Sequence, residues 1–134
     1  MKYNNTYVHM DGIKFRSKLE SVCYELLKEA DLKFEYEPSK WELVPGIEYN
    51  TPSWEKIGKT YKKQRVKVSA ITYVPDFVGD DWLIECKGFF TPEARIKWKL
   101  LKQYLHKNKL SYRLFMPTNK TQLKKTIELI KYGE

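Results

Sequence analysis

Two carboxylates and a lysine stand out in the otherwise apolar, strand-like segment YVPDFVGDDWLIECKG, residues 73–88. Burying charge is costly unless the charge is paired or binds a metal, so Asp76, Glu85 and Lys87 need a physical explanation. Side chains alternate sides along a strand, which puts Glu85 and Lys87 on one face. A turn at residues 79–81 would place two antiparallel strands side by side, so that Asp76 and Glu85 can converge.

Such a group of side chains could carry out metal-assisted phosphodiester hydrolysis. Two carboxylates that lie close together repel each other unless a cation sits between them, and a hard divalent ion such as Mg²⁺ prefers oxygen ligands. Such an ion polarises a phosphate and lowers the pKa of a bound water, while a nearby ammonium positions that water or offsets developing charge. The alternative is that Glu85 and Lys87 form an exposed ion pair of the weak surface kind, with Asp76 at a strand end.

Helices and strands are predicted to alternate around these residues. Apolar residues at helical spacing predict a helix over residues 16–30, where Ser17 and Glu20 have the spacing of a capping box. A second helix is predicted from Thr91, as N-cap, to about residue 107, and a third from about Thr121. Alternating or β-branched segments predict strands at 33–38, 41–45, 65–78, 82–87 and 110–116.

These elements predict one mixed α/β domain, in which helices cover a central sheet. The length of 134 residues suits a single domain, with a core over about residues 11–131. Residues 46–64 contain Gly46, Pro52 and Gly58, and they are interpreted as a polar loop. No apolar run approaches the length of a membrane helix, and the first ten residues lack the apolar core of a signal peptide. A cytoplasmic protein that does not enter membranes is expected.

The positive charge of the chain is concentrated after residue 50. Residues 1–50 hold 7 Lys or Arg against 9 Asp or Glu, whereas residues 51–134 hold 18 against 8. Such asymmetry suggests a polyanionic partner, of which nucleic acid is the commonest, although a solvated basic face would give the same composition. The candidate phosphate contacts in the loop and on the second helix are Lys56, Lys59, Lys62, Lys63, Arg65, Lys67, Arg95, Lys97, Lys99 and Lys102.

Three aromatic residues flank the basic loop: Tyr49, Trp54 and Tyr61. We interpret them as packing residues, with stacking on nucleic-acid bases as the alternative.

The PD…ECK arrangement of Asp76, Glu85 and Lys87 resembles the PD-(D/E)xK nuclease superfamily, and the predicted order of elements resembles its αβββαβ core. The fold expected from this resemblance is restriction-endonuclease-like, with a central mixed sheet flanked by helices. Four blocks together are similar to the bacteriophage endonuclease I family of Holliday junction resolvases: FRSKLE, KFEYEP, YVPDF and IECKG. The segment 46–70 is longer and more basic than in that family. The start DGIKFRSKLE is also similar to small phage proteins thought to belong to the same superfamily.

The resemblance implies a Mg²⁺-dependent DNA endonuclease, with Mn²⁺ as a substitute, that leaves 5′-phosphate and 3′-hydroxyl ends. Asp76, Glu85 and the backbone carbonyl of Cys86 would bind the metal, and Lys87 would assist the attacking water. The FRSKLE block adds Glu20 as a catalytic residue and possible metal ligand, although its position in the capping box offers a purely structural role. Glu35 matches a further acidic position of the family, but acids recur throughout its strand, so the expectation is against even a peripheral role in the site.

The expected substrate is DNA, especially branched or junction DNA, and a homodimer would let two sites cut two strands. A phage-encoded protein of this kind would act inside a bacterial host cell. Two other functions stay open: the nuclease subunit of a transposition machine, and a DNA-binding or assembly protein that keeps the nuclease fold without catalysis. Retention of Asp76, Glu85 and Lys87 together argues against the last.

Overall fold

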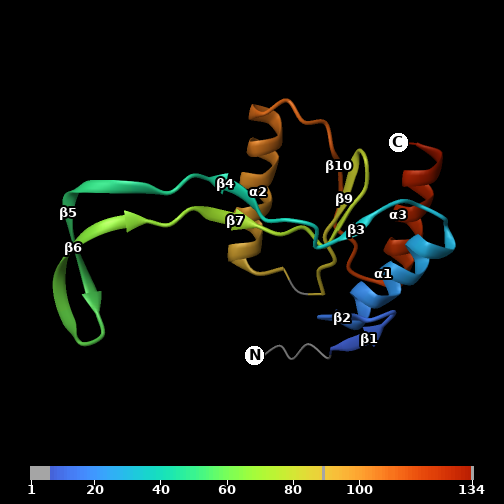
Figure 1. Cartoon of the computed structure of the whole chain (residues 1–134), viewed down its shortest axis with the longest axis horizontal. Coiled ribbons are helices and arrows are strands. Elements are labelled where there is room, and N and C mark those ends of the chain that lie inside the picture. The colour runs from blue at the N-terminus through green and yellow to red at the C-terminus, as the bar shows by residue number, and fades with distance from the viewer. Residues whose placement is uncertain (1–6, 89, 134) are drawn as a thin grey trace.

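The computed structural model describes residues 7–88 and 90–133, and shows a mixed α/β body from which a long hairpin projects (Figure 1). Three helices lie in these residues, each with an N-cap side chain that accepts a hydrogen bond from a backbone N–H. They are α1 (Lys18–Glu29, N-cap Ser17), α2 (Pro92–Lys107, N-cap Thr91) and α3 (Lys120–Tyr132, N-cap Asn119). The three predicted helices are confirmed. None of the described helices is long and apolar enough to cross a membrane.

The body is built around a small mixed sheet of four strands. The strands are β3 (Glu35–Tyr36), β8 (Phe77–Val78), β9 (Trp82–Ile84) and β10 (Arg113–Phe115), in the spatial order β10-β9-β8-β3. β8 and β9 form an antiparallel hairpin in which Phe77 pairs with Ile84, while β10 runs parallel to β9. The predicted hairpin before Glu85 is confirmed.

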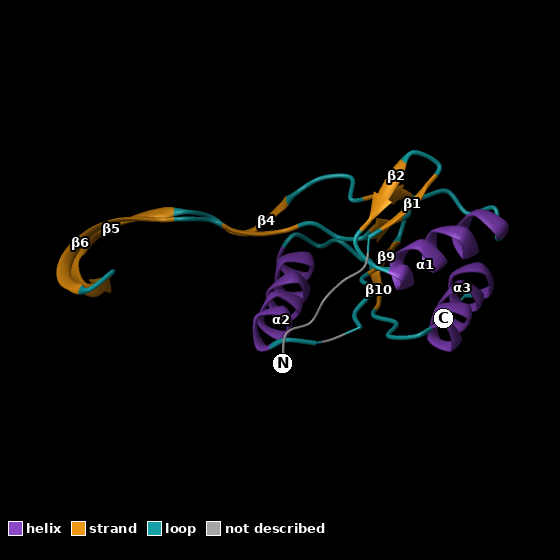
Figure 2. Cartoon of the chain, turned by 90° about the horizontal axis from the view of Figure 1, so that it is seen from below, coloured by secondary structure: helices purple, strands orange, loops and turns teal. Residues whose placement is uncertain are grey.

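Helices cover both faces of this sheet. Consecutive side chains of β9 point to opposite faces, so each contacts a different set of helices. Ile84 packs in a core cluster with residues of α1 and α3, including Leu27 and Leu123. Leu83 packs in a second cluster with Leu101 of α2. Figure 2 shows α1 and α3 side by side on one side of β9 and β10, with α2 on the other.

A short N-terminal hairpin was not expected from the sequence. It consists of β1 (Val8–Met10) and β2 (Ile13–Phe15), which are antiparallel. Asp11 and Gly12 form the turn with φ of 53° and 77°. Two positive φ values are what a type I′ hairpin turn requires, and Asp-Gly is a favoured sequence for it. That dipeptide was the signal that could have revealed the hairpin.

The prediction of one strand over residues 65–78 was wrong. The segment is divided among the end of β6 (Thr60–Val68), β7 (Ile71–Tyr73) and β8. β7 pairs with β4 (Trp41–Val44) in a sheet of their own. Pro75 is fully buried between β7 and β8, and because proline has no N–H it cannot continue a hydrogen-bonded ladder there.

The interpretation of residues 46–64 as a loop was also wrong. β5 (Ile47–Ile57) and β6 form a long antiparallel hairpin that turns at Gly58, where φ is 63°. Pro52 lies where the register shifts between Tyr49 and Ser53, so the loop-like sequence marks a bulge within a strand. This hairpin, residues 47–68, is called the arm below, and it extends away from the body (Figures 1 and 2).

Candidate functional site

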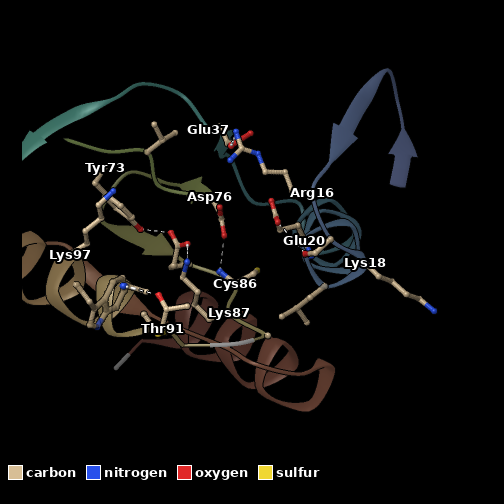
Figure 3. Close-up of a pocket in the computed structure, with 18 of the residues that line it drawn as sticks. Arg16, Lys18, Glu20, Glu37, Tyr73, Asp76, Cys86, Lys87, Thr91 and Lys97 are labelled. Atoms are coloured by element: carbon tan, nitrogen blue, oxygen red, sulfur yellow. Dashed lines mark hydrogen bonds and ion pairs between the residues drawn. The ribbon is translucent and has the colours of Figure 1, made fainter. Parts of the chain in front are cut away.

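The predicted catalytic residues line one pocket of about 920 Å³ in the body. Its wall includes the first turn of α1, the chain on both sides of Pro75, the segment after β9 and the first turns of α2. Figure 3 shows side chains from these segments converging on a common space. Glu20, Asp76, Glu85 and Lys87 all belong to this wall, as does Cys86.

Asp76 is fixed between the two neighbouring segments of the sheet. Its carbonyl oxygen accepts a hydrogen bond of 2.8 Å from the Glu37 N–H, just beyond β3. Its carboxylate Oδ2 accepts another of 2.8 Å from the Cys86 N–H, just beyond β9. The carboxylate therefore replaces a backbone carbonyl at the point where the buried Pro75 interrupts the strand, and it is held at the wall of the pocket.

Glu85 and Lys87 lie on the same side of an extended segment, as predicted. The Glu85 N–H donates to the Phe115 carbonyl at 2.9 Å, and the Lys87 N–H donates to the Pro117 carbonyl at 3.2 Å. The segment after β9 thus continues to follow the segment after β10. Lys87 Nζ lies 3.2 Å from Glu85 Oε2.

The Glu85–Lys87 ion pair is not of the exposed surface kind. The Glu85 side chain is 7% exposed and the Lys87 side chain 30%. The hydroxyl of Tyr73 also donates a hydrogen bond to Glu85 Oε1. Removing charges from water is costly, and such a pair contributes little net stability unless its remaining hydrogen bonds are satisfied.

Glu20 has both the structural contact and the site position that were considered for it. Its backbone N–H donates to Ser17 Oγ at 3.2 Å, which is the N-cap contact of α1. Its carboxylate accepts hydrogen bonds from the Ser17 hydroxyl at 3.1 Å and the Tyr36 hydroxyl at 2.7 Å. The residue is buried and lines the pocket, in which Figure 3 shows its carboxylate on the side facing Asp76.

Burial is the main influence on the pKa values of two carboxyl groups of the pocket. Burial raises the pKa of Asp76 well above its usual range, and the charges of Glu85 and Glu20 raise it further. Burial also raises the pKa of Glu85, while the hydrogen bond from Tyr73 and the charge of Lys87 oppose the rise. The three carboxylates therefore repel one another across one space, and a cation placed there would relieve that repulsion.

The carboxylates are at present bound by donors of the protein itself. Within residues 7–88 and 90–133, no three His, Cys, Asp or Glu side chains stand in an arrangement that would hold a metal ion as they are. Asp76 is engaged by the Cys86 N–H, Glu85 by Tyr73 and Lys87, and Glu20 by Ser17 and Tyr36. Carboxylate oxygens are ligands that a hard divalent cation prefers, so Asp76, Glu85 and Glu20 could hold such an ion only if it replaced these contacts.

Sequence reasoning missed the two tyrosines that hold the carboxylates. Burial is the first cause that raises the pKa of Tyr73 and of Tyr36, followed by the neighbouring carboxylate, so both hydroxyls remain hydrogen-bond donors. Tyr73 precedes Asp76 by three residues and ends β7, whereas Glu85 follows β9. No local pattern in the sequence indicates that contact.

An acidic residue just beyond β3 lines the pocket, although the sequence did not single it out. Glu35 is exposed and lies outside the pocket wall. Glu37 lines the pocket, and its carboxylate lies 3.3 Å from Arg16. Its φ of 45° is unusual for a residue with a side chain. The regular alternation of β3 ends before Glu37, so it does not predict where the Glu37 side chain lies.

The predicted phosphate contacts separate into two groups. On α2, Lys97 lines the pocket, whereas Arg95, Lys99 and Lys102 are exposed beyond it. The arm carries the second group, and none of its described lysines lines the pocket. Its exposed lysines are Lys56, Lys59, Lys62, Lys63 and Lys67, whereas the side chain of Arg65, on β6, lies outside the described part of the structure.

Comparisons with known proteins identify the family of the chain. No curated protein and no solved structure matches it. The model of the family described as "Protein of unknown function (DUF1064)" matches residues 1–132. The match covers nearly the whole sequence, and the chain therefore belongs to the DUF1064 family.

Proposed function

We propose that this protein is a metal-dependent endonuclease that hydrolyses DNA phosphodiester bonds to 5′-phosphate and 3′-hydroxyl ends. The observation that carries the proposal is the meeting of Asp76, Glu85 and Lys87 at one pocket, with Glu20 on its opposite wall. Titratable groups whose pKa is displaced by burial and by one another are typical of catalytic sites. Carboxylates that repel one another in a buried site destabilise the fold, so a core with a purely structural role is not expected to contain them.

The arrangement of elements supports a restriction-endonuclease-like core. When β4–β7, which lie outside the four-stranded sheet, are left aside, α1, β3, β8, β9, α2 and β10 follow one another in the αβββαβ order that the PD-(D/E)xK resemblance implies. The sheet of these strands is mixed, with helices on both faces. Because Phe77 of β8 pairs with Ile84 of β9, the adjoining residues Asp76 and Glu85 lie at the same end of this strand pair.

The proposed cofactor is Mg²⁺, for which Mn²⁺ could substitute. Asp76 and Glu85 would hold the ion, with the Cys86 carbonyl and Glu20 as further oxygen ligands. When bound, such an ion polarises a phosphate and lowers the pKa of a coordinated water.

The protein's own groups orient and balance the charges around the reacting phosphate. The Cys86 N–H fixes the carboxylate of Asp76, and Tyr73 fixes one oxygen of Glu85. Lys87 Nζ, which lies against the other oxygen of Glu85, can donate to an attacking water or to a phosphate oxygen. Lys97 at the rim adds a cation that favours entry of a phosphate backbone.

DNA is the proposed substrate because Lys97 of α2 lines the pocket and three further basic residues of that helix are exposed: Arg95, Lys99 and Lys102. Branched or junction DNA is the proposed preferred form, and two copies of the chain would supply one site for each strand. Phosphate contacts from α2 would position either strand without reading its bases.

A cleavage assay with isosteric variants tests the proposal. The protein is incubated with Mg²⁺ and four-way-junction, linear duplex or single-stranded DNA. Asp76→Asn and Glu85→Gln each remove one negative charge with little change of shape, and each should lower the cleavage rate by at least about 100-fold, the scale for loss of one electrostatic group at a reacting centre. Glu35→Gln is the matched control, since Glu35 is an exposed acid of the same sheet. It should cleave like the wild type.

The pattern of results also decides between the possible functions. Cleavage that is unaffected by Asp76→Asn would refute the assignment of the site. Binding without cleavage in either Mg²⁺ or Mn²⁺ would identify a DNA-binding or assembly protein, a reading consistent with carboxylates that are all engaged by protein donors. Faster cleavage of the four-way junction than of the duplex would support a function like that of the Holliday junction resolvases.

A further inference from the structure

The arm leaves its large apolar side chains in solvent. Trp54 is 55% exposed and Tyr61 is 69% exposed, so neither ring packs in the core, although the two rings pack against each other within the arm. An isolated two-stranded hairpin is marginally stable in water, and nothing in the described part of the body covers this one. Exposed aromatic side chains on such an element indicate a surface that works by contact with a partner.

The side chains of the arm are sorted between its two faces. Residues paired across an antiparallel ladder share a face, and the faces alternate along each strand. Trp54 pairs with Lys63, and two positions further toward the tip Lys56 pairs with Tyr61. These four residues therefore occupy one face, which we call the aromatic–lysine face.

The opposite face of the same segment has a different character. It carries Ser53 paired with Gln64, Glu55 paired with Lys62, and Ile57 paired with Thr60. The single lysine there has an acid directly across from it. The aromatic–lysine face has two lysines and no acid among its four residues, so positive charge and ring surface coincide on one side only.

The aromatic and basic residues of the aromatic–lysine face are cross-strand neighbours. The Trp54 and Tyr61 rings lie on a diagonal of the ladder, with centroids 5.7 Å apart and planes inclined by 35°. Each ring has a lysine directly across the ladder. Proteins that bind single-stranded nucleic acid combine cations that follow the phosphate backbone with aromatic rings on which bases stack.

We propose that the aromatic–lysine face of the arm binds unpaired nucleotides of a DNA substrate, by stacking bases on Trp54 and Tyr61 while Lys56 and Lys63 contact the flanking phosphates. The choice of DNA rests on the proposed function, and the inference adds a substrate class to it: DNA with a single-stranded segment. A stacked duplex keeps its base faces covered, so it can meet the lysines but not the rings. The arm projects from the body, so it would hold DNA at a distance from the pocket (Figure 1).

Binding measured in EDTA tests this inference apart from cleavage. Fluorescence anisotropy is recorded with labelled single-stranded DNA and with a blunt duplex, at about 0.15 M salt, where the screening length is about 8 Å. Trp54→Ala combined with Tyr61→Ala should weaken binding of the single strand by about 10- to 100-fold, the scale for loss of stacked bases. Duplex binding should change much less. Trp54→Phe combined with Tyr61→Phe keeps two rings and should restore most of the affinity.

Two adjacent lysines provide a matched control for charge. Lys63 and Lys62 are both exposed and follow each other on β6, but they lie on opposite faces of the arm. Lys63→Gln should weaken binding and lower the slope of log affinity against log salt by about 0.7, as one lost contact to a single strand does. Lys62 lies across the ladder from Glu55 on the other face, so the inference removes it from the candidate phosphate contacts, and Lys62→Gln should leave that slope unchanged.

Three results would overturn the inference. The first is wild-type affinity for single strands in the Trp54→Ala, Tyr61→Ala variant, and the second is equal effects of the Lys62 and Lys63 substitutions. The third is a change of oligomeric state in the aromatic variant, measured by sedimentation, which would make the arm an interface between copies of the chain. If the wild type does not cleave DNA but the arm variants bind single strands more weakly, the nuclease proposal is refuted and the arm inference is supported. If the wild type cleaves DNA and the arm variants cleave and bind like it, the arm inference is refuted and the nuclease proposal is supported.

Discussion

Two hairpins of this protein show how the same kind of local structure serves different purposes. The β8–β9 hairpin has strands of two and three residues, yet Phe77, Leu83 and Ile84 are fully buried in it. The arm has strands of eleven and nine residues, and apart from a few half-buried positions its described side chains are exposed. The short hairpin is held by what packs around it, whereas the long one is held by its own ladder.

The difference matches the tasks we assign to the two hairpins. Carboxylates that must converge within a few ångströms need a rigid support, and β8 and β9 lie between β3 and β10 with helices on both faces. A surface that follows a flexible nucleic acid needs reach more than rigidity. Stability in proteins varies locally in this way, and binding elements come from the less stable part.

The sharpest way to break this comparison is to truncate one aromatic ring in each hairpin. Phe77→Ala removes a ring that is 0% exposed and should lower the free energy of unfolding by about 3–5 kcal/mol, the range for aromatic residues in cores. Tyr61→Ala removes a ring that is 69% exposed and should change it by no more than about 0.5 kcal/mol. Urea denaturation followed by circular dichroism measures both. Similar losses would mean that the arm belongs to the cooperative core.

The elements of the body were largely predictable because their signals are local. Apolar spacing located α1, α2 and α3, and N-cap residues also marked the starts of α1 and α2. The turn residues 79–81 located the hairpin that brings Asp76 beside the segment of Glu85. The face shared by Glu85 and Lys87 followed from strand alternation alone. These features depend on neighbours in the sequence, which is why a single chain was sufficient to predict them.

The other features depend on contacts between distant segments. Alternation along β6 looks the same whether a helix covers the strand or water does, so the sequence did not distinguish an exposed arm from a core strand. Pro52 and Gly58 suggested a loop, although one marks a bulge and the other a hairpin turn. The contact of Tyr73 with Glu85 and the position of Glu37 required the pairing of the strands to be known.

A second prediction concerns a carboxyl group of the body whose burial is expected to lower the stability of the fold. Asp76→Asn keeps an oxygen for the Cys86 N–H and removes a charge that burial, Glu85 and Glu20 all disfavour. We expect it to raise the free energy of unfolding by about 0.5–2 kcal/mol in EDTA, the usual gain from relieving one unfavourable feature of a functional site. Asp80→Asn, in the exposed turn of the same hairpin, should have no measurable effect. Destabilisation by Asp76→Asn would show that the carboxylate serves the fold.

The smallest expected effect concerns an interaction of the body that is as exposed as the arm. Asp11, in the β1–β2 turn, accepts hydrogen bonds from Lys28 at 2.8 Å and from the Tyr24 hydroxyl at 3.1 Å. The bond from Lys28 is the main cause that lowers the pKa of Asp11, followed by the bond from Tyr24. Both side chains of the pair are about half exposed, so solvent screening keeps the contribution small.

The pH dependence of this contribution has a definite sign. A carboxyl whose pKa is lower in the folded state stabilises the fold above its unfolded pKa of about 3.9, and that stabilisation is lost as the pH falls through the folded-state value. Asn tolerates the positive φ of position 11, so Asp11→Asn should lower the thermal midpoint slightly at neutral pH. The difference from the wild type should shrink as the solution is acidified below about pH 4. If the difference persisted undiminished in acid, the substitution would act through the geometry of the turn and not through the charge of Asp11. The exposure of the Asp11–Lys28 pair would then not explain the small size of the effect.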